Sequence, residues 1–200
     1  MKHELPHFYI GDSYGGNQDW FLTRFMRVGG CGAETACDSC VYFAREFGLT
    51  KLYPGDPWAL TREEYVNFAQ HMRDYLWPRM TGIDRLSIYV EWFGKYLKDC
   101  GEDRLSMAEF SGEESYEAAE AFVRRQIDAG LPIPTLILEH KDPAFRDYFW
   151  HWFLINGYDD TDGFKVKAVT YSEYEWLPLE GLWNTGSRRR GGFVEYRLKE

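Results

Sequence analysis

The sequence lacks the long apolar runs and the leader segments of membrane and exported proteins. No run of about 18 apolar residues occurs in its 200 residues, so the sequence predicts no transmembrane helix. The first residues, MKHELPHFYIGDS, contain neither the apolar stretch nor the small-residue cleavage site of a signal peptide. We therefore expect a cytoplasmic protein without a membrane partner.

Cysteine is scarce, and positive charge is in the minority. The four cysteines, Cys31, Cys37, Cys40 and Cys100, are too few and too unevenly spaced for a disulfide framework, so we expect free thiols. The 23 Lys and Arg face 32 Asp and Glu, and the resulting formal charge of −9 disfavours nucleic acid as a partner. The short basic run at 188–190 is expected to be an exposed hairpin loop. The sequence carries no signal for the oligomeric state.

The chain also lacks internal repeats, low-complexity tracts and long linkers, which predicts a single domain. The spacing of its apolar residues changes near Gly130. The segments before it have the helical period, at 33–47, 65–76, 86–100 and 116–127. The segments after it are short and strand-like, at 136–138, 150–156, 164–171 and 193–198. The polar stretch 159–163 predicts a hairpin between the middle two strands.

These patterns predict an α+β fold. We expect a helical lobe at about 1–130, an antiparallel sheet lobe at about 131–200, and a cleft between them. Thr61 with Glu64, and Ser111 with Glu114, have the spacing of capping boxes at helix starts. Two glycines, Gly48 and Gly130, stand where a left-handed residue closes a helix.

One cysteine stands at a position that favours nucleophilic chemistry. Cys31 follows Gly29 and Gly30 at the first turn of a predicted helix. Unpaired backbone N–H groups and the helix dipole lower the pKa of a thiol placed there, so we expect an activated Cys31. The other cysteines lie on apolar helix stripes, and we interpret them as small buried hydrophobic residues, because no second ligand pair follows at zinc spacing.

Among the five histidines, His151 opens a predicted strand, where an imidazole can be aimed into a cleft as a general base. His140 ranks below it, because Lys141, Asp142 and Pro143 after it indicate a loop. Four aromatic residues beside His151 are expected to shape a substrate cleft. They are Tyr148, Phe149, Trp150 and Trp152.

Four short motifs in this order resemble those of papain-fold cysteine peptidases. They are NQDW at 17–20, GCGAETA at 30–36, IDAGLP at 127–132 and HWFLINGYD at 151–159. The branch that they resemble most is similar to the bacteriocin leader peptidases that cut after a double glycine. The resemblance covers about residues 15–170. It implies a papain-like fold that needs neither cofactor nor metal, acting on a peptide or small acyl substrate.

The resemblance also implies a role for three residues. Cys31 would be the nucleophile, His151 its general base and then acid, and Gln18 would bind the oxyanion together with the Cys31 backbone N–H. The expected reaction is acyl transfer through a thioester, resolved by water in a peptidase or by an amine or thiol in an acyltransferase. A catalytically inactive member that binds a peptide or glycan is the third hypothesis.

The sequence departs from this family at the residue that orients the histidine, which is an Asn or Asp on the strand paired with the histidine strand. Folding 164–171 back across the 159–163 turn places Val169, Thr170 or Tyr171 opposite His151, within about one residue. Thr170 is the only small hydrogen-bonding side chain in that window. Glu173 and Asn184 are further candidates if the following loop bends back.

Overall fold

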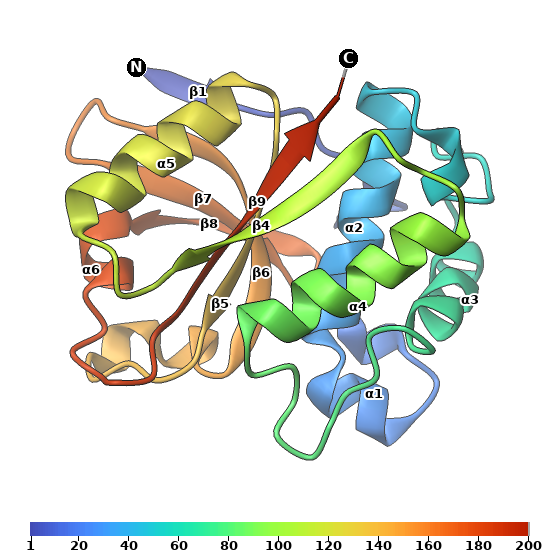
Figure 1. Cartoon of the computed structure of the whole chain (residues 1–200), viewed down its shortest axis with the longest axis horizontal. Coiled ribbons are helices and arrows are strands. Elements are labelled where there is room, and N and C mark those ends of the chain that lie inside the picture. The colour runs from blue at the N-terminus through green and yellow to red at the C-terminus, as the bar shows by residue number, and fades with distance from the viewer. Residues whose placement is uncertain (200) are drawn as a thin grey trace.

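The computed structural model describes residues 1–199, and its centre is an antiparallel sheet of seven strands (Figure 1). The strands follow the order β4-β9-β5-β6-β7-β8, and β1 pairs with the far end of β6. Their bounds are β1 Lys2–Glu4, β4 Leu105–Ser111, β5 Ile133–Ile137, β6 His151–Asp159, β7 Lys165–Thr170, β8 Glu173–Pro178 and β9 Gly191–Leu198. A separate small hairpin joins β2 (Tyr9–Ile10) and β3 (Ser13–Tyr14).

Helices lie on both sides of this sheet: α1 to α4 on one side, and α5 and α6 on the other (Figure 1). Their bounds are α1 Arg24–Gly29, α2 Cys31–Glu46, α3 Arg62–Met72, α4 Leu86–Asp99, α5 Tyr116–Asp128 and α6 Leu179–Trp183. Short 3-10 helices occupy Gln18–Trp20, Thr50–Leu52 and Pro143–Tyr148. None of the helices described is long and apolar enough to cross a bilayer.

Alternating residues of the sheet fill two aromatic layers. On the α5 side, Phe193 of β9 packs against Phe122 of α5 and Trp183 of α6, with ring centroids 5.4 and 4.5 Å away. On the other side, Tyr196 of the same strand meets Phe43 of α2 at 4.9 Å. Much of the aromatic content is therefore part of the core, where such rings contribute large buried areas.

Helix α2 is buried from Cys31 to Ala44 and contacts both β6 and α3. Small side chains along it, such as Ala33, Ala36 and Cys40, allow this close approach from several sides. Gly48 follows its end with a φ of 65°, as the sequence predicts. The helix that carries Cys31 is thus a rigid central element.

The α+β class is confirmed, and the four helices expected from periodicity are present as α2 to α5. The hairpin of β6 and β7 is present as well. The division near Gly130 is incomplete, however, because β1 and β4 join the sheet from the first part of the chain. The cap predicted at Ser111 is wrong: Ser111 ends β4, and Ser115 caps α5 by accepting the N–H of Ala118.

Candidate active site

Cys31 is the first residue of α2, as predicted. Gly30 is both the C-cap of α1 and the N-cap of α2. A side chain at this position would collide with the Met26 carbonyl and the Phe21 ring. Because Gly30 offers no side-chain cap, the first N–H groups of α2 remain available around the Cys31 thiol. The glycines before Cys31 therefore serve the tight junction of two helices.

The net effect on the Cys31 thiol is opposite to the prediction from sequence. Burial raises the pKa of Cys31 to about 11, and the charge of Glu34 acts in the same direction. Backbone N–H groups of Trp152, Gly32 and Cys31 lower this pKa, as expected at a helix start, but burial outweighs them. The expected lowered pKa is therefore wrong, and the resting residue at neutral pH is a thiol.

His151 opens β6 and is buried, with 4% of its surface exposed. Its Nε2 lies 2.7 Å from the Thr170 hydroxyl, and its ring stacks on Tyr171 with centroids 5.0 Å apart and planes 6° apart. Burial lowers the pKa of His151 to about 4, so the imidazole is neutral at neutral pH. The hydrogen bond to Thr170 leaves Nδ1 available for a proton from another group.

The hairpin register accounts for the contact between Thr170 and His151. Leu154 pairs with Val169, and Ile155 with Ala168. Continuing this register puts Thr170 opposite Phe153, two residues from His151 and on the same face of the sheet, so the two side chains meet diagonally. The residue in line with His151 is Ser172, one position beyond the window of 169–171 expected from the sequence. Of the other two candidate orienting residues, Glu173 is the exposed start of β8 and Asn184 is the exposed end of α6.

Trp152 connects the thiol to the histidine strand. Its backbone N–H faces the Cys31 thiol and lowers the pKa of that group, and its indole Nε1 donates to the Ile83 carbonyl at 2.7 Å. A Cβ on Gly32 would lie 3.6 Å from the Trp152 ring and 3.0 Å from Ile83, so a glycine allows α2 to begin against this residue. The Cys31 sulfur therefore lies beside the residue that follows His151.

Backbone strain is concentrated around His151. In residues 1–199, positive φ outside glycine occurs at Trp150 (51°), Tyr171 (52°) and Ser172 (65°) and nowhere else. Trp150 immediately precedes His151, and Tyr171 stacks on its ring. Such conformations cost on the order of 1–3 kcal/mol each and occur preferentially at functional sites. The clustering of these three residues around His151 indicates a functional site without reference to any sequence motif.

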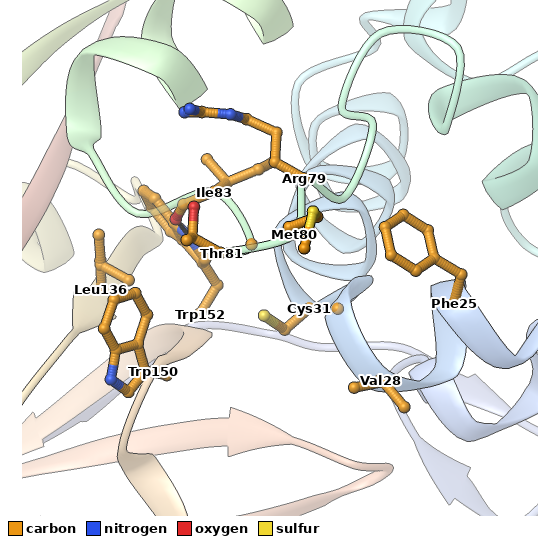
Figure 2. Close-up of a pocket in the computed structure, with 12 residues that line it drawn as sticks. Phe25, Val28, Cys31, Arg79, Met80, Thr81, Ile83, Leu136, Trp150 and Trp152 are labelled. Carbon is orange, nitrogen blue, oxygen red and sulfur yellow. Dashed lines mark hydrogen bonds between the residues drawn. The ribbon is translucent and has the colours of Figure 1, made fainter.

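A cavity of about 380 Å³ opens at Cys31, and its lining is mainly apolar (Figure 2). In Figure 2, Cys31 lies between the two tryptophans on one side and Phe25 and Val28 on the other. The lining residues are Phe25, Val28, Gly29, Cys31, Arg79, Met80, Thr81, Gly82, Ile83, Leu136, Trp150 and Trp152. Of the residues predicted from the sequence to shape a cleft, Trp150 and Trp152 belong to this lining.

The remaining predicted cleft and site residues lie elsewhere. His151 and Gln18 are not part of the cavity lining. Tyr148 is buried and donates its hydroxyl to Glu175 at 3.0 Å, and Phe149 packs against the core. His140 fixes a loop, because its Nδ1 accepts the N–H of Asp142 and its Nε2 lies 2.9 Å from the Gly181 carbonyl.

Gln18 is buried beside the start of α2, but its side chain is already engaged. Its Nε2 donates to the Arg27 carbonyl at 2.7 Å, and its Oε1 is buried without a hydrogen bond. One of the two side-chain amide protons of Gln18 is therefore used in the hydrogen bond to α1. A contribution to an oxyanion site would depend on the second proton.

Two buried carboxyl groups on α2 were not assigned a role from the sequence. Glu34 accepts the backbone N–H of Gln18 at 3.0 Å, and Asp38, one turn later, accepts the Tyr65 hydroxyl at 2.6 Å. Burial raises the pKa of Glu34, as does the charge of Asp38, and burial raises the pKa of Asp38 to about 7. The sequence does contain a signal for them, because these two acidic residues stand four positions apart on a helix stripe of otherwise small and apolar residues.

The other cysteines are free, with Cys37 and Cys40 buried and Cys100 half-buried. The described residues contain no group of three or more His, Cys, Asp or Glu side chains placed to hold a metal ion. The side chains described above offer a thiol, an imidazole and hydrogen-bond donors. Comparisons with protein families, curated proteins and solved structures give no match to this chain.

Proposed function

We propose that the protein is a cysteine hydrolase, in which Cys31 is the nucleophile and His151 the general base and acid. The observation that carries the proposal is the way His151 is held. A hydroxyl on one ring nitrogen and a stacked tyrosine fix the imidazole, next to the residue whose N–H reaches the Cys31 sulfur. An imidazole held in this way, one residue before the tryptophan beside a thiol at a helix start, offers the base and the nucleophile that acyl transfer requires.

In the proposed reaction, the Thr170 hydroxyl oxygen accepts a hydrogen bond from the Nε2–H group, and Nδ1 of His151 takes the thiol proton as Sγ bonds to the substrate carbonyl carbon. The Cys31 backbone N–H stabilises the oxyanion. The leaving amine or alcohol then takes the proton from His151 as its bond to carbon breaks, which leaves a thioester. Water attacks the thioester while giving a proton to His151, and this proton returns to sulfur as the acid leaves.

Thr170 replaces the Asn or Asp of the family that the sequence resembles. A neutral hydroxyl can accept a hydrogen bond from Nε2–H and fix the ring, but it adds no negative charge to stabilise an imidazolium. Together with the burial of both groups, this favours a neutral thiol and imidazole at rest. The proton would then move only as the carbonyl is attacked.

The cavity favours substrates with an apolar group beside the scissile carbonyl. Phe25, Val28, Met80 and Trp150 are all exposed apolar side chains that surround Cys31. Burial of an apolar group contributes about 25 cal/mol per Å² removed from water, so a medium-sized side chain or acyl chain would be held by these walls. Peptides with an apolar residue and short acyl esters both fit this description.

The protonation states also favour a second candidate, a catalytically inactive member that binds a peptide or glycan. A thiol with a raised pKa and an imidazole with a lowered pKa are compatible with a site that binds without reacting. Cys31→Ala separates the two hypotheses, because a binding protein would keep its ligand affinity and its function in that variant.

The test uses p-nitrophenyl esters from acetate to octanoate and aminocoumarin amides of apolar residues. We expect hydrolysis by the native protein and a loss of about a thousandfold or more in Cys31→Ser and in His151→Ala. Cys100→Ser is the matched control and should keep full activity. Adding amine acceptors distinguishes hydrolase from acyltransferase, because transfer would give the amide product. Full activity in Cys31→Ser would refute the proposal.

A further inference from the structure

We propose that Asp84 closes one end of the Cys31 cavity and thereby limits the length of the apolar group that the site accepts. This inference rests on the proposed use of that cavity for the apolar group of a substrate. Asp84 lies in the loop before α4, and two arginines share its carboxylate. One of these arginines lines the cavity, and the other covers a tryptophan of the cavity wall.

A second cavity, of about 260 Å³, shares part of its lining with the cavity at Cys31. Leu136 lines both cavities, and the consecutive residues Ile83 and Asp84 line the first and the second respectively. Leu138 continues the apolar wall into the second cavity. The two spaces are therefore separated by the short segment that contains Asp84 and by the groups that Asp84 binds.

Two ion pairs hold the carboxylate of Asp84 at this boundary. Arg79 Nη1 lies 3.4 Å from Asp84 Oδ1, and Arg189 Nη2 lies 3.4 Å from Asp84 Oδ2. In Figure 2 the guanidinium of Arg79 points away from Phe25, toward the side of the cavity where Leu136 lies. The pair with Arg189 joins the loop before α4 to the loop before β9.

Arg189 extends this bridge to the opposite wall of the cavity. It belongs to the basic run at 188–190, and its guanidinium carbon lies 4.5 Å from the centroid of the Trp150 ring. A guanidinium at this distance from an aromatic ring forms a cation–π contact. Trp150 lines the cavity at Cys31. Asp84 thus connects the loop on one side of the cavity, through Arg189, to the tryptophan on the other.

The bridge contributes more to the shape of the cavity than to the stability of the fold. The three charged side chains are 16 to 47% exposed, and ion pairs with such exposure contribute little to stability. Their separation of 3.4 Å is also longer than the roughly 2.7–2.9 Å of a strong charge-assisted hydrogen bond. We therefore expect variants without the bridge to fold and to differ in the groups that they accept.

The test compares the rates at which butyl and decyl methanethiosulfonate modify Cys31, in a Cys100→Ser background and with peptide mapping of the product. These reagents transfer an alkylthio group to a thiol, so the reading requires no hydrolysis. Each further methylene group that leaves water increases binding roughly fourfold. In Asp84→Ala the decyl chain can extend into the second cavity, so the ratio of decyl to butyl rates should rise about tenfold or more.

Glu195→Ala is the matched control. Glu195 also pairs with two arginines, Arg125 and Arg197, and its side chain has the same 16% exposure as that of Asp84. It is not among the residues that line either cavity, so its removal should leave the ratio unchanged. Arg189→Ala breaks the same bridge from the other side and should raise the ratio as well, which provides a reading if Asp84→Ala does not fold.

A ratio equal to the native one in folded Asp84→Ala, or in Arg189→Ala if only that variant folds, would overturn the proposal. Hydrolysis of p-nitrophenyl esters from butyrate to dodecanoate separates this outcome from a failure of the proposed function. A protein that hydrolyses none of these esters but shows the raised ratio would refute the hydrolase proposal and leave the role of Asp84 standing. Ester hydrolysis with an unchanged ratio would refute the role of Asp84 alone.

Discussion

Replacing Thr170 by Val removes the hydroxyl that holds His151 and changes almost nothing else in shape. The Nε2 atom of His151 is buried and lies 2.7 Å from the hydroxyl, so the variant leaves a buried polar group without its partner. Such a loss costs about 1–3 kcal/mol. If the ring must keep this orientation during the reaction, the same amount is lost in the transition state, which corresponds to a decrease of roughly 5- to 150-fold in kcat/KM.

The assay is ester hydrolysis, followed together with the rate of Cys31 alkylation. Thr170→Ser is the matched control, because it keeps a hydroxyl at the same position, and it should retain most of the activity. Circular dichroism shows whether both variants remain folded. Equal kcat/KM in Thr170→Val and the native protein, with an unchanged His151 titration, would refute the orienting role of Thr170.

Two further predictions concern protonation. Because burial raises the pKa of Cys31 to about 11, its alkylation rate should rise steadily from pH 6 to pH 9, and a plateau at acidic pH would contradict a neutral resting thiol. Burial raises the pKa of Asp38 from 3.8 to about 7, so the native protein should lose stability relative to Asp38→Asn as the pH rises through that window and the buried carboxyl group ionises. Urea unfolding of both proteins at pH 4 and pH 7.5 measures this difference, and a pH-independent difference would contradict it.

The start of α2 could be predicted from the sequence because its signals are local. Glycines before Cys31 and a regular apolar stripe after it indicate a helix that begins at the cysteine, and α2 begins there. Thr170 was a candidate partner of His151 because a polar turn between two strand-like runs predicts a hairpin, although the observed register lies one position beyond the expected window. Short-range patterns were sufficient for these parts of the site.

The protonation states and supports of the site depend on contacts that the sequence does not reveal. The N–H groups around Cys31 act on its pKa in the predicted direction, but the surrounding β6 strand and cavity walls bury the thiol and reverse the outcome. Asp38 and Tyr65 are 27 positions apart, and only the folded chain brings them together. Strand β4 was missed because its mixture of buried and exposed residues follows no clear alternation.

The most direct test of the central claim is detection of an acyl-enzyme by intact-protein mass spectrometry after rapid mixing with p-nitrophenyl octanoate. We predict a mass increase equal to the octanoyl group, located on Cys31 by peptide mapping, present in Cys100→Ser and absent in Cys31→Ser. Hydrolysis of the ester that continues in Cys31→Ser, or an adduct on Cys100 in place of Cys31, would contradict the assignment of Cys31 as the nucleophile.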